Sequence, residues 1–248
     1  MDIKLHLENH HAKSSAKYIK NIIYGGIDGI ITTFSIIAAC FGANLNIKYI
    51  IAMGFANLIA DGFSMGIGDY ISSFFEAKYI LSEANKESIE FETNNEYEIR
   101  EMVGLYTNEG IDEEDSQKIV DVLISKSEYK PFFIKSMVSM ELGLEIPDKD
   151  YKSEIKKEAL ITFGSFLIFG FIPFIIYIIS HWCRYSNNNT IFIIDCFITL
   201  LTISCLGYIQ AHITKQSKLM GCLILTINGV ISTTIAFSIG YGLEKALN

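Results

Sequence analysis

The first hydrophobic stretch of the chain contains a carboxylate. Asp28 lies within the ten residues GGIDGIITTF, with glycines on both sides of it. A charged side chain at the centre of a bilayer costs about 2.5–3.5 kcal/mol on insertion scales, so such residues normally face a partner, a cavity or an ion. The neighbouring glycines allow close helix packing or a kink. Asp28 therefore predicts a place where a cation or a proton binds within an apolar helix.

A second hydrophobic stretch carries a polar or sulfur-containing side chain at every fourth position. These are Asn57, Asp61, Met65 and Asp69 in NLIADGFSMGIGDYIS. A step of four residues turns a helix by only about 40° beyond a full turn, so the four side chains form one slowly winding stripe. Such a stripe is unfavourable against lipid and predicts a pathway or a helix interface. A thioether among oxygen ligands favours a first-row transition metal over calcium or magnesium.

A polar segment that follows the second stretch contains two pairs of glutamates. Glu87 pairs with Glu90, and Glu98 pairs with Glu101, each at a spacing of three residues. Residues three or four apart share a helix face, so each pair can present two carboxylates to one ion. Met137 and Glu141 repeat the mixture of sulfur and oxygen further along the chain. The pattern predicts a divalent-metal site, with a solvated acidic surface as the alternative.

Five hydrophobic stretches are long enough to hold these residues in a membrane, since a bilayer core needs roughly 20 apolar helical residues. Only 19% of the residues are charged, whereas soluble domains average about 25%. We therefore expect an all-α membrane protein with five transmembrane helices. The expected spans are 22–45, 49–75, 159–179, 191–211 and 219–241.

The expected domain plan places a polar insertion between the second and third spans. Residues 1–21 form an N-terminal segment, 22–76 the first two spans, 77–157 the insertion, and 158–248 the last three spans. The insertion holds 19 Asp and Glu against 11 Lys and Arg, a net charge of −8. Its apolar spacing predicts three helices over 77–107, 112–126 and 131–144, with a break in the first at Asn94–Asn95.

The distribution of lysine predicts the orientation in the membrane. Four lysines precede the first span, and Lys215 and Lys218 lie between the fourth and fifth spans. Because short cytoplasmic flanks are enriched in Lys and Arg, we expect the N-terminus and the acidic insertion to be cytoplasmic. A strongly acidic insertion would be repelled by phosphates, which argues against a nucleic-acid partner.

Two other function classes fit some of the same residues. A membrane ferroxidase would be an enzyme, but di-iron bundles favour Glu-x-x-His pairs and zinc proteases favour HExxH, and the sequence has neither. We therefore expect no catalytic residues and no resident cofactor. A metal-gated cation channel would use the same carboxylates, and voltage-driven flux without a proton requirement would distinguish it from a proton-coupled transporter.

Taken together, the motifs resemble the vacuolar iron transporter family. The resemblance rests on GGIDGIITTFSIIAA, NLIADGFSMGIGDYIS, the glutamate pairs and MELGLEIPD, and it covers about 18–242. It implies a homodimer of five-span chains with the ion path between the first two spans of both protomers. It also implies antiport of Fe²⁺ against protons, from the cytosol across an organelle membrane into a vacuole-like or endoplasmic-reticulum store.

The resemblance also implies roles for individual residues. Asp28 and Met65 match the family's metal ligands in the membrane. The cytoplasmic metal site is matched by Glu87, Glu90, Glu98, Glu101, Met137 and Glu141. Two positions depart from the pattern: Asn57 stands where some members have glutamate, and Val138 where some have a second methionine. The ligand chemistry also tolerates Mn²⁺, Co²⁺, Ni²⁺ and Zn²⁺.

Overall fold

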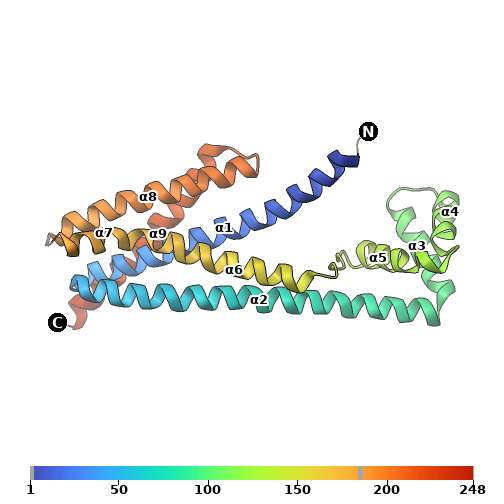
Figure 1. The fold of residues 1–248 in the computed structure, drawn as a ribbon, viewed down its shortest axis with the longest axis horizontal. Helices are drawn as coiled ribbons and strands as arrows, with labels where there is room; N and C mark the ends of the chain where they lie inside the picture. Colours follow the sequence, from blue (N-terminus) through green and yellow to red (C-terminus); the bar gives the residue numbers. More distant parts are fainter. Residues whose placement is uncertain (1–2, 184–186, 248) are drawn as a thin grey trace. The chain divides into compact units, whose positions relative to one another are not determined.

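A computed structural model describes residues 3–183 and 187–247, with side chains from residue 18 onward. Every element in these ranges is helical, which confirms the all-α prediction (Figure 1). The helices are α1 (Ile3–Gly42), α2 (Ile47–Thr93), α3 (Asn95–Asn108), α4 (Glu113–Ile124), a short 3₁₀ turn η1 (Ser127–Tyr129), α5 (Lys130–Glu141), α6 (Tyr151–Gly170), α7 (Ile172–Trp182), α8 (Asn188–Ile213) and α9 (Lys218–Leu247).

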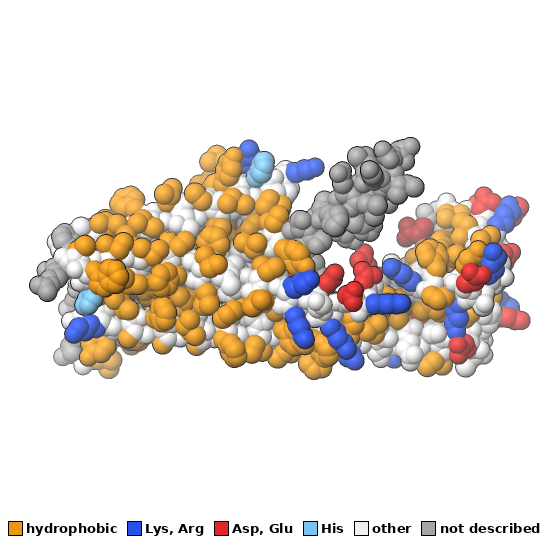
Figure 2. Space-filling view, in the orientation of Figure 1, with side chains coloured by type: hydrophobic (Ala, Val, Ile, Leu, Met, Phe, Trp, Pro, Cys, Tyr) orange, Lys and Arg blue, Asp and Glu red, His pale blue; other side chains and the backbone are white. Residues whose placement is uncertain are grey.

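The helices form two compact units. The bundle unit comprises the chain up to Tyr70 and from Lys156 onward, and the acidic unit comprises Ile71–Ile155. Hydrophobic side chains dominate the visible face of the bundle unit, whereas acidic and basic side chains are frequent on the acidic unit (Figure 2). The first part of α2 belongs to the bundle unit and its last part to the acidic unit.

Small residues let the backbones of the bundle helices approach closely. α1 packs along α9 and also touches α7 and α8, and α8 packs along α9. A Cβ atom at Gly29 of α1 would lie 2.3 Å from the carbonyl oxygen of Phe166 in α6. One at Gly240 of α9 would lie 2.1 Å from the carbonyl oxygen of Ala39. Such close contacts are typical of helices packed in a membrane, where small residues replace the hydrophobic effect as the basis of association.

Several helices are long and apolar enough to cross a membrane. α1, α2, α8 and α9 each qualify alone, whereas α6 and α7 qualify only as a pair that is bent by 40°. The described chain thus offers four spans, or five if the bent pair crosses as one. The sequence predicted one uninterrupted third span over 159–179. The structure interrupts it at Phe171, because Pro173 at the start of α7 has no N–H to continue the ladder of hydrogen bonds.

The boundary predicted after the second span is wrong. A separate helix was expected to begin at 77, but α2 continues without interruption from Ile47 to Thr93. No glycine or proline occurs between Asp69 and Thr93, so nothing in the sequence stops the helix. A helix of this length spans about 70 Å, more than twice the ~30 Å hydrocarbon core. Only part of α2 can lie in a bilayer, and we take that part to be 49–75.

The three-helix prediction for the insertion is otherwise close to the observed elements. Asn94 separates α2 from α3, at the predicted interruption. α4 begins after Asp112, whose side chain accepts a hydrogen bond from the Glu114 N–H and caps the helix. The last helix, α5, ends at Glu141 rather than at 144.

Candidate functional site

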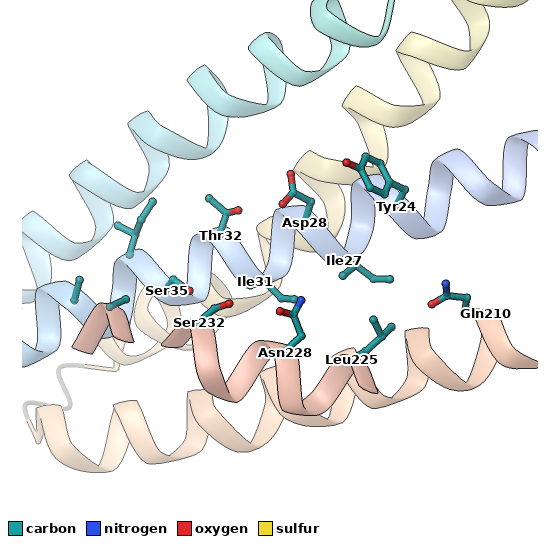
Figure 3. Close-up of a pocket in the computed structure, with 13 residues that line it drawn as sticks. Tyr24, Ile27, Asp28, Ile31, Thr32, Ser35, Gln210, Leu225, Asn228 and Ser232 are labelled. Carbon is teal, nitrogen blue, oxygen red and sulfur yellow. The ribbon is translucent and has the colours of Figure 1, made fainter. Parts of the chain in front are cut away.

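Asp28 is the carboxylate that connects the two predicted membrane motifs. It lies on α1, accepts a hydrogen bond from the Thr32 hydroxyl one turn later, and is close enough to Asp61 of α2 to interact with it electrostatically. Asp28 and Thr32 project from the same side of α1 (Figure 3). The fold therefore brings together two acidic side chains that are 33 positions apart in the sequence. Two carboxylates that interact electrostatically repel each other unless a proton or a cation is shared between them.

Asp28 also borders a groove that the sequence analysis did not predict. A cavity of about 700 Å³ lies between α1, α8 and α9. Among its polar lining residues, Asn228 and Ser232 extend from α9 toward α1 (Figure 3). These two residues are four positions apart in an apolar span, which is the same spacing that marked the stripe on α2. That spacing is the sequence signal from which the polar lining on α9 could have been predicted.

The predicted stripe on α2 lies at the edge of a helix interface. All four of its residues are half-buried. The Asn57 amide donates a hydrogen bond to the Asp61 carboxylate, and the Thr162 hydroxyl of α6 donates one to Asp69 at 2.9 Å. Met65 packs against an apolar cluster that includes Leu58 and Phe166. The stripe thus combines one hydrogen bond within α2, one between α2 and α6, and ordinary packing at Met65.

The acidic unit gathers the predicted glutamates. Glu87 and Glu98 are buried, with 6% and 5% of their surface exposed. Glu87 interacts electrostatically with four further carboxylates, two of them on α3, one on α5 and one on its own helix. These neighbours are Glu90, Glu98, Glu101 and Glu141. All five predicted glutamates therefore belong to one cluster, which we call the glutamate cluster.

The negative charge of the glutamate cluster is poorly compensated. In the part of the acidic unit that the structure describes, the ion pairs use other acids: Lys86 pairs with Glu83, Lys130 with Glu92, Arg100 with Glu96, and Lys118 with Glu114 and Asp115. Burial, together with the neighbouring carboxylates, raises the pKa of Glu87 to about 7. The same causes raise the pKa of Glu98 and of Glu141. The cluster thus favours a proton or a cation at neutral pH.

The predicted sulfur ligand is buried in the core of the acidic unit. Met137 has no exposed surface and packs with Met102, Val120 and Phe133 in the core of the acidic unit. Within the described ranges, no three Asp, Glu, His or Cys side chains already adopt a metal-coordinating arrangement. A bound ion would therefore have to draw the glutamate side chains together, and its coordination by Met137 would require that side chain to rotate.

Comparisons with known proteins cover nearly the whole chain. A model of the VIT family matches residues 19–241. A Toxoplasma gondii protein named vacuolar iron transporter is 33% identical over 95% of this chain and 77% of its own length. The Plasmodium falciparum protein of the same name is 34% identical over 98% of this chain and 88% of its own. Vacuolar iron transporter 1 of Arabidopsis thaliana is 25% identical over 94% and 88%. These relatives are named as transporters and not as enzymes.

Proposed function

The chain belongs to the VIT family, and we propose that it carries Fe²⁺ across an organelle membrane into a vacuole-like or endoplasmic-reticulum store in exchange for protons. The observation that carries this proposal is the electrostatic interaction of Asp28 with Asp61, together with the position of Asp28 at the border of a groove in an otherwise apolar bundle. The names of the relatives point to iron as the substrate and to a vacuole as the compartment.

Exchange follows from competition between iron and protons for the same oxygen atoms. A deprotonated Asp28 binds Fe²⁺ that arrives from the cytosol, with Asp61 as a second anionic oxygen donor. Protons from an acidic lumen neutralise the carboxylates and release the ion. Met65 adds a soft ligand one turn beyond Asp61, and Asp69 lies one turn further along the same stripe. Asn57, which donates to Asp61, positions that carboxylate in the path.

The glutamate cluster is proposed to collect Fe²⁺ in the cytosol and deliver it to the membrane path. Buried carboxylates without basic partners lower their free energy by binding a divalent cation. Glu87 and Glu98 supply buried oxygens, and Glu90, Glu101 and Glu141 supply more exposed ones. The same ligands accept Mn²⁺, Co²⁺, Ni²⁺ and Zn²⁺, so iron selectivity is a separate question from binding.

The proposed assembly is a homodimer of five-span chains, with the bent pair α6–α7 crossing as one span. α2 carries a row of exposed apolar side chains between Phe55 and Ile71, which suits a lipid-facing surface or a second copy. The N-terminus and the acidic insertion, 77–157, are placed on the cytoplasmic side by the lysine distribution.

The test is Fe²⁺ uptake into proteoliposomes that contain the full-length protein. A lumen more acidic than the outside should drive uptake, with alkalinisation of the lumen in step with the iron that enters. Adding Mn²⁺, Co²⁺, Ni²⁺ or Zn²⁺ as competitors ranks the metals. Flux that follows voltage and ignores the pH step would replace the antiporter by a channel, and oxygen consumption on adding Fe²⁺ would indicate a ferroxidase.

The pH dependence of metal binding should report the titration of Glu87. Because its pKa is raised to about 7, the folded protein holds this proton more tightly than the unfolded chain does. Its ionisation as the pH rises from about 4.5 to 7 therefore lowers the stability of the folded acidic unit.

A bound cation replaces the proton of Glu87. Fe²⁺ affinity, measured anaerobically by titration calorimetry, should fall below pH 7 by up to about tenfold per pH unit for one displaced proton.

A matched pair of variants tests whether Glu87 causes this dependence. Glu87→Gln should weaken Fe²⁺ binding at pH 8 and flatten its change between pH 6 and 8. Glu128→Gln, which alters an exposed acid of η1 outside the glutamate cluster, should leave both unchanged. An unaltered pH profile in Glu87→Gln would show that another group titrates.

A further inference from the structure

A second carboxylate is enclosed in the bundle unit, away from the proposed path. Asp195 lies two turns into α8 and has no exposed surface. Its Oδ1 accepts a hydrogen bond from the Thr199 hydroxyl at 3.3 Å, and Thr199 is itself fully buried. Its Oδ2 has no hydrogen-bond partner in the structure. An ionisable residue enclosed among membrane helices is a functional candidate by default.

A tyrosine hydroxyl in the same state lies nearby. Tyr177 of α7 is 1% exposed, and its hydroxyl also has no hydrogen-bond partner. It is close enough to the Asp195 carboxyl to interact with it electrostatically. Two buried polar groups without hydrogen-bond partners are both desolvated and unsatisfied, which is costly unless a proton, a water molecule or a small rearrangement connects them.

Among the described residues, no positive charge balances Asp195 from the elements packed against it. On α8 itself its titratable neighbour is Cys196, and from α1 and α7 the titratable groups at this level are Cys40 and Tyr177. α9 runs antiparallel to α8, with Thr226 opposite Ser204, so residues 231–239 lie at the level of Asp195, and none of them is charged. α2 contributes apolar Ile50 beside Tyr177. Because burying an unpaired charge is costly, these described surroundings favour the protonated, neutral form of Asp195.

The position of Asp195 along the bundle differs from that of Asp28. On α1, Ile30 packs against Ile203 of α8, and Phe41 stacks on Phe192 at a ring distance of 4.1 Å. Asp195 lies between these two contacts, level with a part of α1 about ten residues beyond Asp28, which corresponds to roughly 15 Å. In the proposed orientation this is the side of Asp28 that faces the store.

We infer that Asp195, with Tyr177 and Thr199, is a second proton-binding site on the store side of Asp28. This inference rests on the proposed proton exchange. The step involves no redox change: an O–H bond of the Asp195 carboxyl breaks, the proton passes to water when the bundle opens, and a proton from the store later restores the acid. Thr199 orients the carboxyl, and the Tyr177 hydroxyl offers a donor to the carboxylate while it is ionised. The pH of the store thereby governs the return of the transporter to the state in which Asp195 is protonated.

The test compares Asp195→Asn with wild type in full-length protein. Asparagine keeps the shape of the side chain but cannot release a proton. In proteoliposomes the pH-driven uptake of Fe²⁺ should fall at least about tenfold, the effect of losing one charge-assisted interaction on a rate. The uptake that remains should depend less steeply on the lumenal pH, because only the titration of Asp28 and Asp61 is left, and Asp195→Glu should restore the wild-type dependence. Undiminished uptake with the wild-type pH profile would overturn the inference.

A spectroscopic measurement separates this inference from the proposed transport. In infrared difference spectra of the wild-type protein, lowering the pH should protonate the glutamate cluster and should also produce a separate carboxylic acid band from Asp195. The band should be absent in Asp195→Asn and shifted in Tyr177→Phe, a variant that removes only one hydroxyl. A band unchanged in both variants would exclude Asp195 as the titrating group. Wild-type protein that shows this band but no pH-driven iron uptake would defeat the proposed antiport and leave the proton site in place.

Discussion

Replacing Asp28 by asparagine is expected to abolish most pH-driven uptake of Fe²⁺ into proteoliposomes. The substitution removes the negative charge that is proposed to bind the ion, leaves Thr32 without a carboxylate to donate to, and removes the repulsion on Asp61. A hydrogen bond or ion contact to a charged group is worth about 1.5–3 kcal/mol, which corresponds to roughly a ten- to hundredfold loss in rate. The measurement is the initial rate of iron entry after a pH step, normalised to the amount of reconstituted protein.

Two further variants show whether the loss is specific to the path. Thr32→Val keeps the Asp28 charge and removes only the hydrogen-bond donor, so it should cause a smaller loss. Ser238→Ala removes a membrane hydroxyl that bonds only to its own helix, at the Thr234 carbonyl, and should leave uptake unchanged. Full uptake in Asp28→Asn would remove this carboxylate from the mechanism and would leave the glutamate cluster as a general cation-binding site.

Gly29→Ala is expected to cause a large loss of stability. Its new methyl group would lie 2.3 Å from the Phe166 carbonyl oxygen and 2.9 Å from the carbonyl carbon, both of which are backbone atoms that no rotamer change can move. α1 and α6 would have to separate. Overpacking of this kind costs about 1–3 kcal/mol, and each kcal/mol lowers Tm by about 2–4 °C in a chain of this size. Thermal unfolding in detergent, followed by size-exclusion chromatography, measures the shift.

Gly164→Ala is the matched control on α6. A Cβ at this position meets nothing within 4 Å, so the substitution adds helix propensity worth about 0.5–1 kcal/mol without a clash. Its Tm should stay the same or rise. Equal destabilisation by both variants would mean that the loss comes from glycine itself rather than from the contact between α1 and α6.

The continuous α2 is longer than the hydropathy pattern predicts. Hydropathy indicates where apolar residues end, near 75, but a helix ends only where its backbone is interrupted. The segment after 75 is polar and strongly helix-forming, so α2 continues to Asn94, the first break in the helix. In contrast, the interruption at Phe171 was missed because a proline in an apolar run leaves hydropathy unchanged while it removes one backbone donor.

The sequence by itself determined the all-α class, the apolar stretches and the types and spacing of the candidate ligands. These follow from local rules, because helix periodicity and the cost of a carboxylate in lipid act on neighbouring residues. Only the tertiary structure decided which carboxylates meet. It brought Asp28 within electrostatic range of Asp61, gathered five glutamates from α2, α3 and α5, and buried both Asp195 and Tyr177. Those encounters depend on which helix faces touch, and that is set by packing between segments far apart in the chain, which no single segment encodes.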